Sequence, residues 1–277
     1  MSANPHAPTV GVFDSGFGGL TVLRALIEKL PAARFAFVGD TARLPYGSKS
    51  RRTIARYAAQ SARFLVEEQD AEYLVIACNT ASALALDAIK EAVSVPVLGV
   101  IEPGAGAARA ASNSGDVLVI ATDATVQSQA YSAACRAHGL RAIEKACPLL
   151  VPLVEEGWTD HSVTKEVIDI YLGELREEAW ARGLNPDTLV LGCTHYPLLR
   201  PLIERAVRPG VKVIDSAEAT AAVAAEMFNG RASAAGAEAG ETEIRCFATD
   251  SVEKFERLGS RFLGRTVGKV ELLDLGG

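Results

Sequence analysis

Residues 9–20 read Thr9-Val-Gly-Val-Phe-Asp-Ser-Gly-Phe-Gly-Gly-Leu20 and indicate the fold class most clearly. The first five residues form a short apolar run, and the Asp-Ser-Gly-Phe-Gly-Gly segment after them has the composition of a tight turn. Leucine and isoleucine then recur at helical spacing as far as Leu30. The stretch therefore predicts a strand, a turn and a helix, which is the repeating unit of α/β proteins.

The same unit recurs along the chain. Apolar runs predict further strands at 35–38, 73–77, 95–99, 117–121, 142–145, 189–191 and 212–214. Helical patterns lie between them, at about 50–69, from 79 to near 93, at 126–138, at 163–182 and from 216 to about 228. Strands that alternate with helices imply parallel sheets covered on both faces. The Ala- and Gly-rich stretch 229–240 is expected to be a mobile surface loop, and strands near 244–248 and 269–273 are expected to pack on the first half.

Two of the strand ends carry similar sequences. One reads Tyr73-Leu-Val-Ile-Ala-Cys78-Asn-Thr and the other reads Leu189-Val-Leu-Gly-Cys193-Thr-His. An aspartate that follows an earlier strand, Asp14 or Asp123, precedes each cysteine at a similar distance. We interpret this as an approximate internal duplication. It predicts two similar doubly wound α/β domains with mainly parallel sheets, formed by residues 1–98 plus 211–277 and by residues 99–210, with the active site in the cleft between them.

Composition excludes several classes of function. The net charge is −6 and no basic run exceeds Lys49-Ser-Arg-Arg, which argues against nucleic-acid binding. The apolar runs are short and the first residues lack a signal-peptide pattern, so we expect a cytoplasmic protein that does not bind membranes. The five cysteines include no CxxC pair, and only four histidines are present. These numbers argue against a disulfide framework and a zinc site, and we expect no metal.

The candidate site residues follow the predicted strands. Ligands of open α/β sheets bind at the carboxyl ends of the strands, where Asp14, Asp40, Cys78, Thr122 and Cys193 all lie. A thiol at the start of a helix is expected to have a lowered pKa, because the helix dipole favours the thiolate. A single cysteine after a buried strand is often only core filling. Two cysteines in matched settings favour a catalytic role over core filling.

Two opposed thiols suit the inversion of a stereocentre. That reaction requires a base on one face of the carbon and an acid on the other. Most enzymes handle the Cα–H of an amino acid through a pyridoxal imine on a lysine or through a metal. None of the eight lysines falls at the strand-end turns that carry the candidates, so no cofactor is expected. The carbanion then depends on hydrogen bonds to the α-carboxylate and on the exclusion of water.

The other candidates have competing structural explanations. His195 could exchange a proton with Cys193, or it could be a buried core histidine. Asp14 could serve Cys78 or bind the substrate ammonium, and it could also cap a helix. Glu155 is either a third acid near the cleft or an exposed loop acid. Leu44-Pro-Tyr-Gly-Ser has the composition of a carboxylate-binding loop or of an ordinary turn, and Gly16-Phe-Gly-Gly lacks the dinucleotide spacing.

Five segments together resemble the glutamate racemases of the aspartate/glutamate racemase family. They are Phe13-Asp-Ser-Gly-Phe-Gly-Gly-Leu, Gly39-Asp-Thr-Ala-Arg-Leu-Pro-Tyr-Gly, Ala77-Cys-Asn-Thr-Ala, Pro152-Leu-Val-Glu-Glu-Gly and Leu191-Gly-Cys-Thr-His-Tyr-Pro-Leu-Leu. The resemblance spans essentially the whole chain, with no departure at a matched functional position. It implies a cofactor-independent enzyme that supplies D-glutamate for peptidoglycan in a bacterial cytoplasm.

The resemblance also implies roles for individual residues. Cys78 would act on the D-glutamate face and Cys193 on the L-glutamate face, with Asp14 and His195 assisting them and Glu155 tuning the Cys193 side. The substrate contacts would be Asp14, Ser15, Tyr46, Gly47, Asn79, Thr80, Thr194 and His195.

Other readings stay open at the level of sequence. Aspartate or another amino acid could replace glutamate as the substrate. A two-lobed amino-acid-binding protein without catalysis, or a thiol redox protein, would also place residues at these strand ends. The sequence does not determine the oligomeric state, for which a homodimer is one option.

Overall fold

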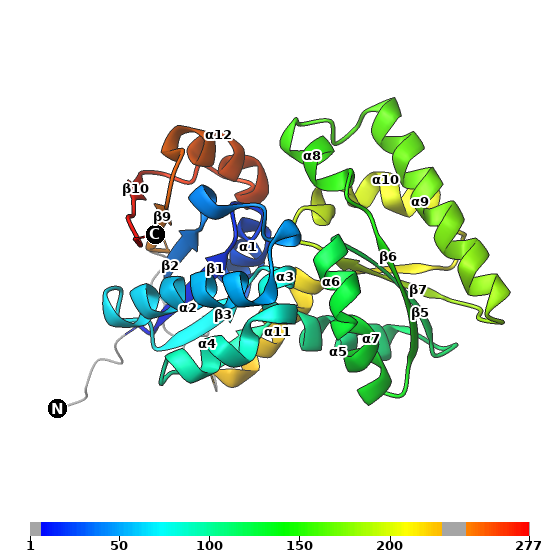
Figure 1. Ribbon diagram of the computed structural model, residues 1–277, viewed down its shortest axis with the longest axis horizontal. Helices are drawn as coiled ribbons and strands as arrows, with labels where there is room; N and C mark the ends of the chain where they lie inside the picture. The colour runs from blue at the N-terminus through cyan, green and yellow to red at the C-terminus, as the bar shows by residue number, and fades with distance from the viewer. Residues whose placement is uncertain (1–6, 229–241, 277) are drawn as a thin grey trace.

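Two all-parallel sheets form the framework of the protein (Figure 1). The computed structural model describes residues 7–228 and 242–276. The six-stranded sheet has the order β10-β9-β2-β1-β3-β4, and the four-stranded sheet has the order β6-β5-β7-β8. The first comprises β1 (Thr9–Asp14), β2 (Arg34–Gly39), β3 (Tyr73–Ile76), β4 (Val97–Gly99), β9 (Ile244–Ala248) and β10 (Val270–Leu272); the second comprises β5 (Asp116–Ala121), β6 (Arg141–Ala146), β7 (Thr188–Gly192) and β8 (Lys212–Asp215). The predicted α/β class with two doubly wound units is confirmed.

The two sheets share one topology. Within each set of four consecutive strands, the second strand lies at one side of the first, and the third and fourth lie at the other side. In this arrangement β1 corresponds to β5, β2 to β6 and β3 to β7. The shared order supports the internal duplication that the two cysteine segments suggested. Strands β1, β5 and β7 are buried along their whole length, as expected for parallel strands covered on both faces.

Two helices cross between the units. Helix α5 (Ile101–Ala111) follows β4 of the first sheet but packs on β7 and β8 of the second. Helix α11 (Ser216–Met227) follows β8 but packs on α1 (Leu20–Lys29) of the first. The two helices also contact each other. This exchange joins the units through their cores.

The expected domain division misplaces one strand. It assigned residues 211–277 to the first domain, whereas β8 pairs with β7 in the second sheet. Most of the C-terminal segment does lie where it was expected, because β9 pairs with β2 and β10 pairs with β9. The stretch 229–240, predicted to be a mobile loop, lies outside the described residues. In the part of the chain that the structure describes, no helix is long and apolar enough to cross a membrane.

The long helices follow the predicted pattern, and the short ones depart from it. Helices α2 (Arg51–Glu67) and α9 (Ser162–Ala181) match the predictions closely. Two predicted helices are each broken into a pair: α3 (Asn79–Leu84) with α4 (Leu86–Ala92), and α6 (Asp123–Ser128) with α7 (Ala130–Ala137). The helices that the sequence analysis missed are α5, α8 (Leu150–Glu155), α10 (Arg200–Ala206) and α12 (Val252–Leu263). The first three contain proline near their N-terminal ends, where proline is tolerated, so its presence misled the prediction.

Candidate active site

A cavity of about 280 Å3 lies where the strand-end turns of both sheets meet. Of the predicted site residues, all except Asp14 and Asp40 line it. The lining from the first sheet is Ser15, Gly16, Phe17, Leu44, Pro45, Tyr46, Gly47, Cys78, Asn79 and Thr80; that from the second is Thr122, Asp123, Pro148, Val151, Pro152, Glu155, Cys193, Thr194 and His195. These segments follow β1, β2 and β3 in one unit and their counterparts β5, β6 and β7 in the other. The duplication therefore builds one site from two copies of the same three turns.

Each cysteine turn makes a direct hydrogen-bonding contact with the other unit. The Thr21 hydroxyl of α1 donates a hydrogen bond to the Thr194 carbonyl at 3.1 Å. The Thr80 hydroxyl of α3 lies 3.1 Å from that of Thr122, at the start of α6. Thus the turn after β1 meets the turn after β7, and the turn after β3 meets the turn after β5. This pairing is the one expected for two related units that face each other.

Gly18 allows the closest of these approaches. A Cβ at this position would lie 2.4 Å from Thr194 Oγ1 and 2.5 Å from His195 Nδ1. Real Cβ atoms do not come so close to other atoms, so any side chain here would displace the side chains of Thr194 and His195. The Gly-Phe-Gly-Gly sequence, which the sequence analysis weighed as a weak phosphate signal, thus has a packing reason.

Cys78 lies between β3 and α3 and is 5% exposed. Its Sγ accepts a hydrogen bond from the Ala81 N–H at 3.4 Å, and the thiol lies 3.4 Å from Ser15 Oγ. Burial and, to a smaller extent, the nearby Asp14 carboxylate raise the pKa of the Cys78 thiol to about 11. The lowered pKa predicted from the helix terminus is therefore wrong, because desolvation outweighs the backbone donors.

Cys193 lies in the matching place after β7 and is 6% exposed. Burial is the main cause of a raised pKa here as well, opposed by the backbone N–H of His195. His195 packs between the aromatic rings of Phe17 and Phe262, at centroid distances of 6.0 and 5.0 Å. The imidazole thus has an apolar wall on two sides and a polar neighbour, Glu155, on another.

Glu155 lies on α8 and meets His195 from the mouth of the cavity. His195 Nε2 is 3.4 Å from Glu155 Oε1, which is within ion-pair distance but long for a hydrogen bond. Glu155 Oε2 is 3.5 Å from Lys254 Nζ of α12. Desolvation raises the pKa of the Glu155 carboxyl, but His195 and Lys254 oppose it, and the net pKa is lowered. Of the two readings left open for Glu155, the structure favours the acid at the cleft over the loop acid.

Asp14 lies beneath the cavity rather than on its surface. The carboxylate is 1% exposed and accepts a hydrogen bond from the Gly16 N–H at 3.0 Å, while its other oxygen has no hydrogen-bond partner among the described residues. Burial raises the pKa of Asp14, and the charge of His195 acts in the opposite direction. A carboxyl with a raised pKa and an unpaired oxygen, placed beside a thiol, is suited to proton exchange.

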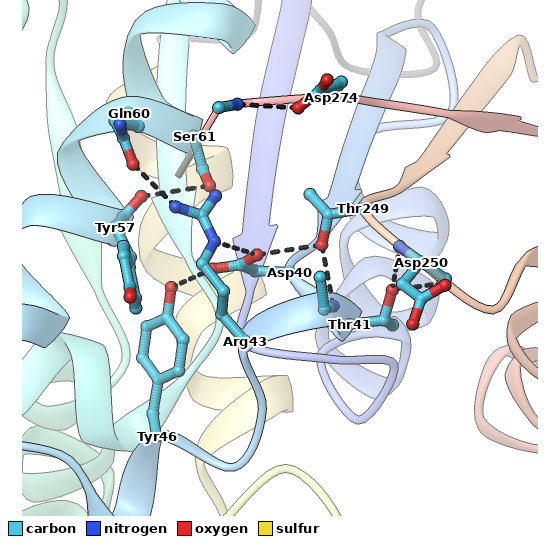
Figure 2. A network of polar contacts seen from close by, with 12 residues as sticks. Asp40, Thr41, Arg43, Tyr46, Tyr57, Gln60, Ser61, Thr249, Asp250 and Asp274 are labelled. Carbon is cyan, nitrogen blue, oxygen red and sulfur yellow. Dashed lines mark hydrogen bonds and ion pairs between the residues drawn. The ribbon is translucent and has the colours of Figure 1, made fainter.

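The segment 44–47 rests on a buried polar network that Figure 2 shows. Asp40 accepts hydrogen bonds from the Tyr46 hydroxyl at 2.5 Å, from Arg43 Nε at 2.8 Å and from Thr249 Oγ1 at 2.9 Å. Arg43 also donates to Gln60 Oε1 at 2.6 Å. The Tyr46 hydroxyl is therefore used within the protein, and the network fixes the backbone that borders the cavity.

Asn79 lines the cavity and has an unused hydrogen-bond donor. The Tyr131 hydroxyl donates to Asn79 Oδ1 at 2.7 Å, which orients the side-chain amide. Its Nδ2 is buried and has no hydrogen-bond partner within the described residues. A buried donor without a partner is costly unless a ligand satisfies it.

Comparison with known proteins identifies the family. Residues 10–224 match the family model described as Asp/Glu/Hydantoin racemase. The glutamate racemase of Koribacter versatilis is 53% identical and covers 98% of each chain. A glutamate racemase isoform from Bacillus anthracis superposes with a TM-score of 0.88 at 36% identity, over 98% of this chain and 99% of that one. The glutamate racemase of Francisella tularensis, solved in complex with D-glutamate, gives a TM-score of 0.85 at 34% identity and 98% coverage of both.

The chain belongs to the glutamate racemases of this family. Some residues of the glutamate racemase cavity were not singled out from sequence, namely Phe17, Val151 and Pro152, because apolar lining has no signature distinct from core residues. Lys254 was missed for a different reason. It lies on α12, a helix that was not predicted, and it meets Glu155 only through the tertiary fold. The apolar spacing of Phe255, Leu258 and Phe262 was the available signal for that helix.

Proposed function

We propose that this chain interconverts L- and D-glutamate with two thiols, without a metal or an organic cofactor. One of them, as a thiolate, removes the α-proton, and the other donates its own proton to the opposite face of the carbon. One observation carries the proposal. Cys78 and Cys193 are buried at corresponding turns of two related sheets and border a single cavity. An inversion needs two opposed proton carriers, and the duplicated fold supplies them.

The proton balance follows from this placement. In the direction from L to D, the Cys193 thiolate removes the α-proton of L-glutamate and becomes a thiol. The Cys78 thiol then donates its proton to the opposite face of the carbanion and becomes a thiolate. The reverse direction exchanges the two roles. After each turnover the site is reset when one thiol gives up a proton and the other thiolate regains one, with Asp14 serving Cys78 and His195 serving Cys193.

The raised pKa values are consistent with this use of the thiols. A thiolate with a higher pKa is a stronger base, and the α-proton of an amino acid is only weakly acidic. The same burial makes the thiolate scarce in the empty site. A partner that takes the thiol proton is therefore needed on each side. Asp14, whose charge acts on Cys78, and His195, whose backbone N–H contacts Cys193, are our candidates for these partners.

Neutral donors would hold the substrate. Among the described residues no lysine or arginine lines the cavity, although glutamate carries two carboxylates. We assign the α-carboxylate to Ser15, Asn79, Thr80 and Thr194, because the free amide of Asn79 supplies a donor that is already oriented. Hydrogen bonds at this group also stabilise the carbanion, since negative charge spreads onto the carboxylate as the proton leaves.

The segment 44–47 would receive the side-chain carboxylate. The Tyr46 hydroxyl is bonded to Asp40, so the backbone of Tyr46 and Gly47 makes this contact. His195 would complete the substrate contacts on the Cys193 side. Asp14, which lies beneath the cavity, would act on Cys78 more than on the substrate. We place the reaction in the bacterial cytoplasm, where D-glutamate is consumed in peptidoglycan synthesis.

The test is to incubate the purified chain with L-glutamate in deuterated water. Circular dichroism and α-deuterium content are followed together, with the Cys78→Ala/Cys193→Ala double variant as the control. Decay of the optical signal together with deuterium in the D-glutamate product is expected. Binding of glutamate without either change, in folded and reduced protein, would instead indicate an amino-acid-binding protein. Faster turnover of aspartate would retain the mechanism but change the substrate.

A further inference from the structure

Lys254 reaches the active site without touching the cavity. It lies on α12 of the first unit, and its Nζ is 3.5 Å from Glu155 Oε2 on α8 of the second. The same ammonium lies 5.6 Å from the ring centroid of Phe17, which packs against His195. Lys254 does not line the main cavity. Any effect of Lys254 on the site must therefore pass through Glu155 or Phe17.

The contact of Lys254 with Glu155 spans the two units. In Figure 1, α12 and α8 face each other across the top of the molecule. A second contact lies beside the first, because Arg261 Nη1 comes within 2.5 Å of the position that a Cβ would take on Gly157. Two cationic side chains of α12 thus meet the C-terminal end of α8. Glu155 is held at the place where these elements meet.

The imidazole of His195 has two polar neighbours, Thr194 and Glu155. The rings of Phe17 and Phe262 confine the imidazole. They offer it no hydrogen-bond acceptor, so they do not fix the direction in which its two nitrogens point. Its Nδ1 lies 3.5 Å from Thr194 Oγ1, and its Nε2 has no hydrogen-bond partner among the described residues beyond the 3.4 Å approach to Glu155. A carboxylate that is itself held in place orients an imidazole better than a mobile carboxylate does.

We propose that Lys254 is a positioning residue for the reaction, which holds Glu155 so that Glu155 orients His195 toward Cys193. The inference rests on the proposed function, in which His195 exchanges a proton with Cys193. The charge of Lys254 is also one cause of the lowered pKa of the Glu155 carboxyl. The side chains of Lys254 and Glu155 are 44% and 22% exposed, so solvent screens the pair and its effect is modest.

The experiment compares Lys254→Gln, Lys254→Arg and Arg257→Gln. Arg257 is an exposed residue of the same helix with no ion-pair partner among the described residues, so its replacement removes the same charge without touching Glu155. We expect Lys254→Gln to lower kcat about 3- to 5-fold with KM changed less than about 2-fold. Lys254→Arg should restore most of kcat, and Arg257→Gln should match the unmodified chain.

Two further readouts separate positioning from a general effect on folding. The primary isotope effect with α-deuterated L-glutamate should rise in Lys254→Gln, because the Cys193 step becomes slower, while that with α-deuterated D-glutamate should not. In a Glu155→Gln background, Lys254→Gln should cause no further loss, since both act through one contact. Full additivity of the two losses, or a Lys254→Gln variant as active as Arg257→Gln, would overturn the proposal. An unmodified chain without racemase activity would overturn the proposed function instead.

Discussion

The two halves of the site have the same architecture, but the titratable side chains near their thiols differ. Cys78 has a buried carboxylate, Asp14, that belongs to its own sheet and is 1% exposed. Cys193 has an imidazole in its own turn, and the chain of contacts continues through Glu155 to Lys254 at the surface. Duplication of one α/β unit thus explains why two thiols face each other. The residues around the two thiols have diverged. As a result, the Cys78 side ends at the buried Asp14, whereas the contacts on the Cys193 side extend through Glu155 to the exposed Lys254.

The largest expected effect comes from removing either thiol. Cys78→Ala and Cys193→Ala should each lower racemisation by about 10⁴-fold, the upper range for loss of a general acid or base. Each variant keeps one thiol and should still exchange one α-proton with solvent. In deuterated water Cys78→Ala should label L-glutamate alone, and Cys193→Ala should label D-glutamate alone, as measured by mass spectrometry after chiral separation. Labelling of the opposite enantiomers would reverse the facial assignment, and full activity in either variant would remove that thiol from the mechanism.

Replacing Asp14 or His195 should also affect the two sides of the site differently, with a smaller loss of activity than replacing a thiol. Asp14→Asn and His195→Asn are each expected to lower kcat about 10²- to 10³-fold, because a thiol without its proton acceptor is seldom ionised. The two enantiomers have equal free energy in solution, so kcat/KM must fall equally in both directions, and the side affected is read from isotope effects. The effect with α-deuterated D-glutamate should rise in Asp14→Asn, and that with α-deuterated L-glutamate in His195→Asn.

A matched control for these variants is Asp169→Asn. Asp169 forms an exposed ion pair with Lys165 on α9, far in sequence from either thiol. Its replacement should leave kcat within about 2-fold, as surface pairs contribute little. If Asp14→Asn and His195→Asn both raised the isotope effect of the same enantiomer, the assignment of Asp14 to Cys78 and of His195 to Cys193 would be wrong.

The contact between the two halves can be disturbed at Gly18. Gly18→Ala should lower kcat about 100-fold, because the new methyl group would displace Thr194 and His195 by a fraction of an ångström or more. A loss of about 1 to 3 kcal/mol in the free energy of unfolding is also expected from overpacking. Gly173→Ala, in helix α9 with only Arg176 near its Cβ position, is the control and should gain stability in chemical denaturation. Equal behaviour of the two variants would contradict the close approach seen at Gly18.

The smallest expected effect concerns the relative reactivity of the two thiols. The pKa of Cys78 is raised to about 11, and the Cys193 pKa is raised further, in part by the charges of Cys78 and Asp14. Between pH 8 and 10 both thiolates become more abundant as pH rises, with Cys78 ahead. Iodoacetamide should therefore alkylate Cys78 about 3-fold faster or more, as followed by peptide mass spectrometry, and glutamate should protect both. Faster alkylation of Cys193 would reverse the order of the two pKa values.

Much of the site was predictable because its residues follow strands. A buried strand produces a short apolar run, and the residue after it lies at the carboxyl edge of the sheet, so Cys78, Cys193 and the Thr194-His195 pair could be placed from local sequence. The pKa of the thiols could not be predicted in this way. The local signal, a helix terminus, favours the thiolate, whereas the depth of burial depends on residues from both units.

Periodicity and short motifs were sufficient to predict the α/β class, the repeated unit and the two thiols, since each of these depends on residues close together in the chain. The folded structure was needed to show which sheet β8 joins, how α5 and α11 cross between the units, and that Asp14 lies beneath the cavity. The tertiary structure likewise brought Lys254 to Glu155. The physical reason is that these features depend on the packing of segments far apart in the chain, and such packing leaves no periodic trace in either segment.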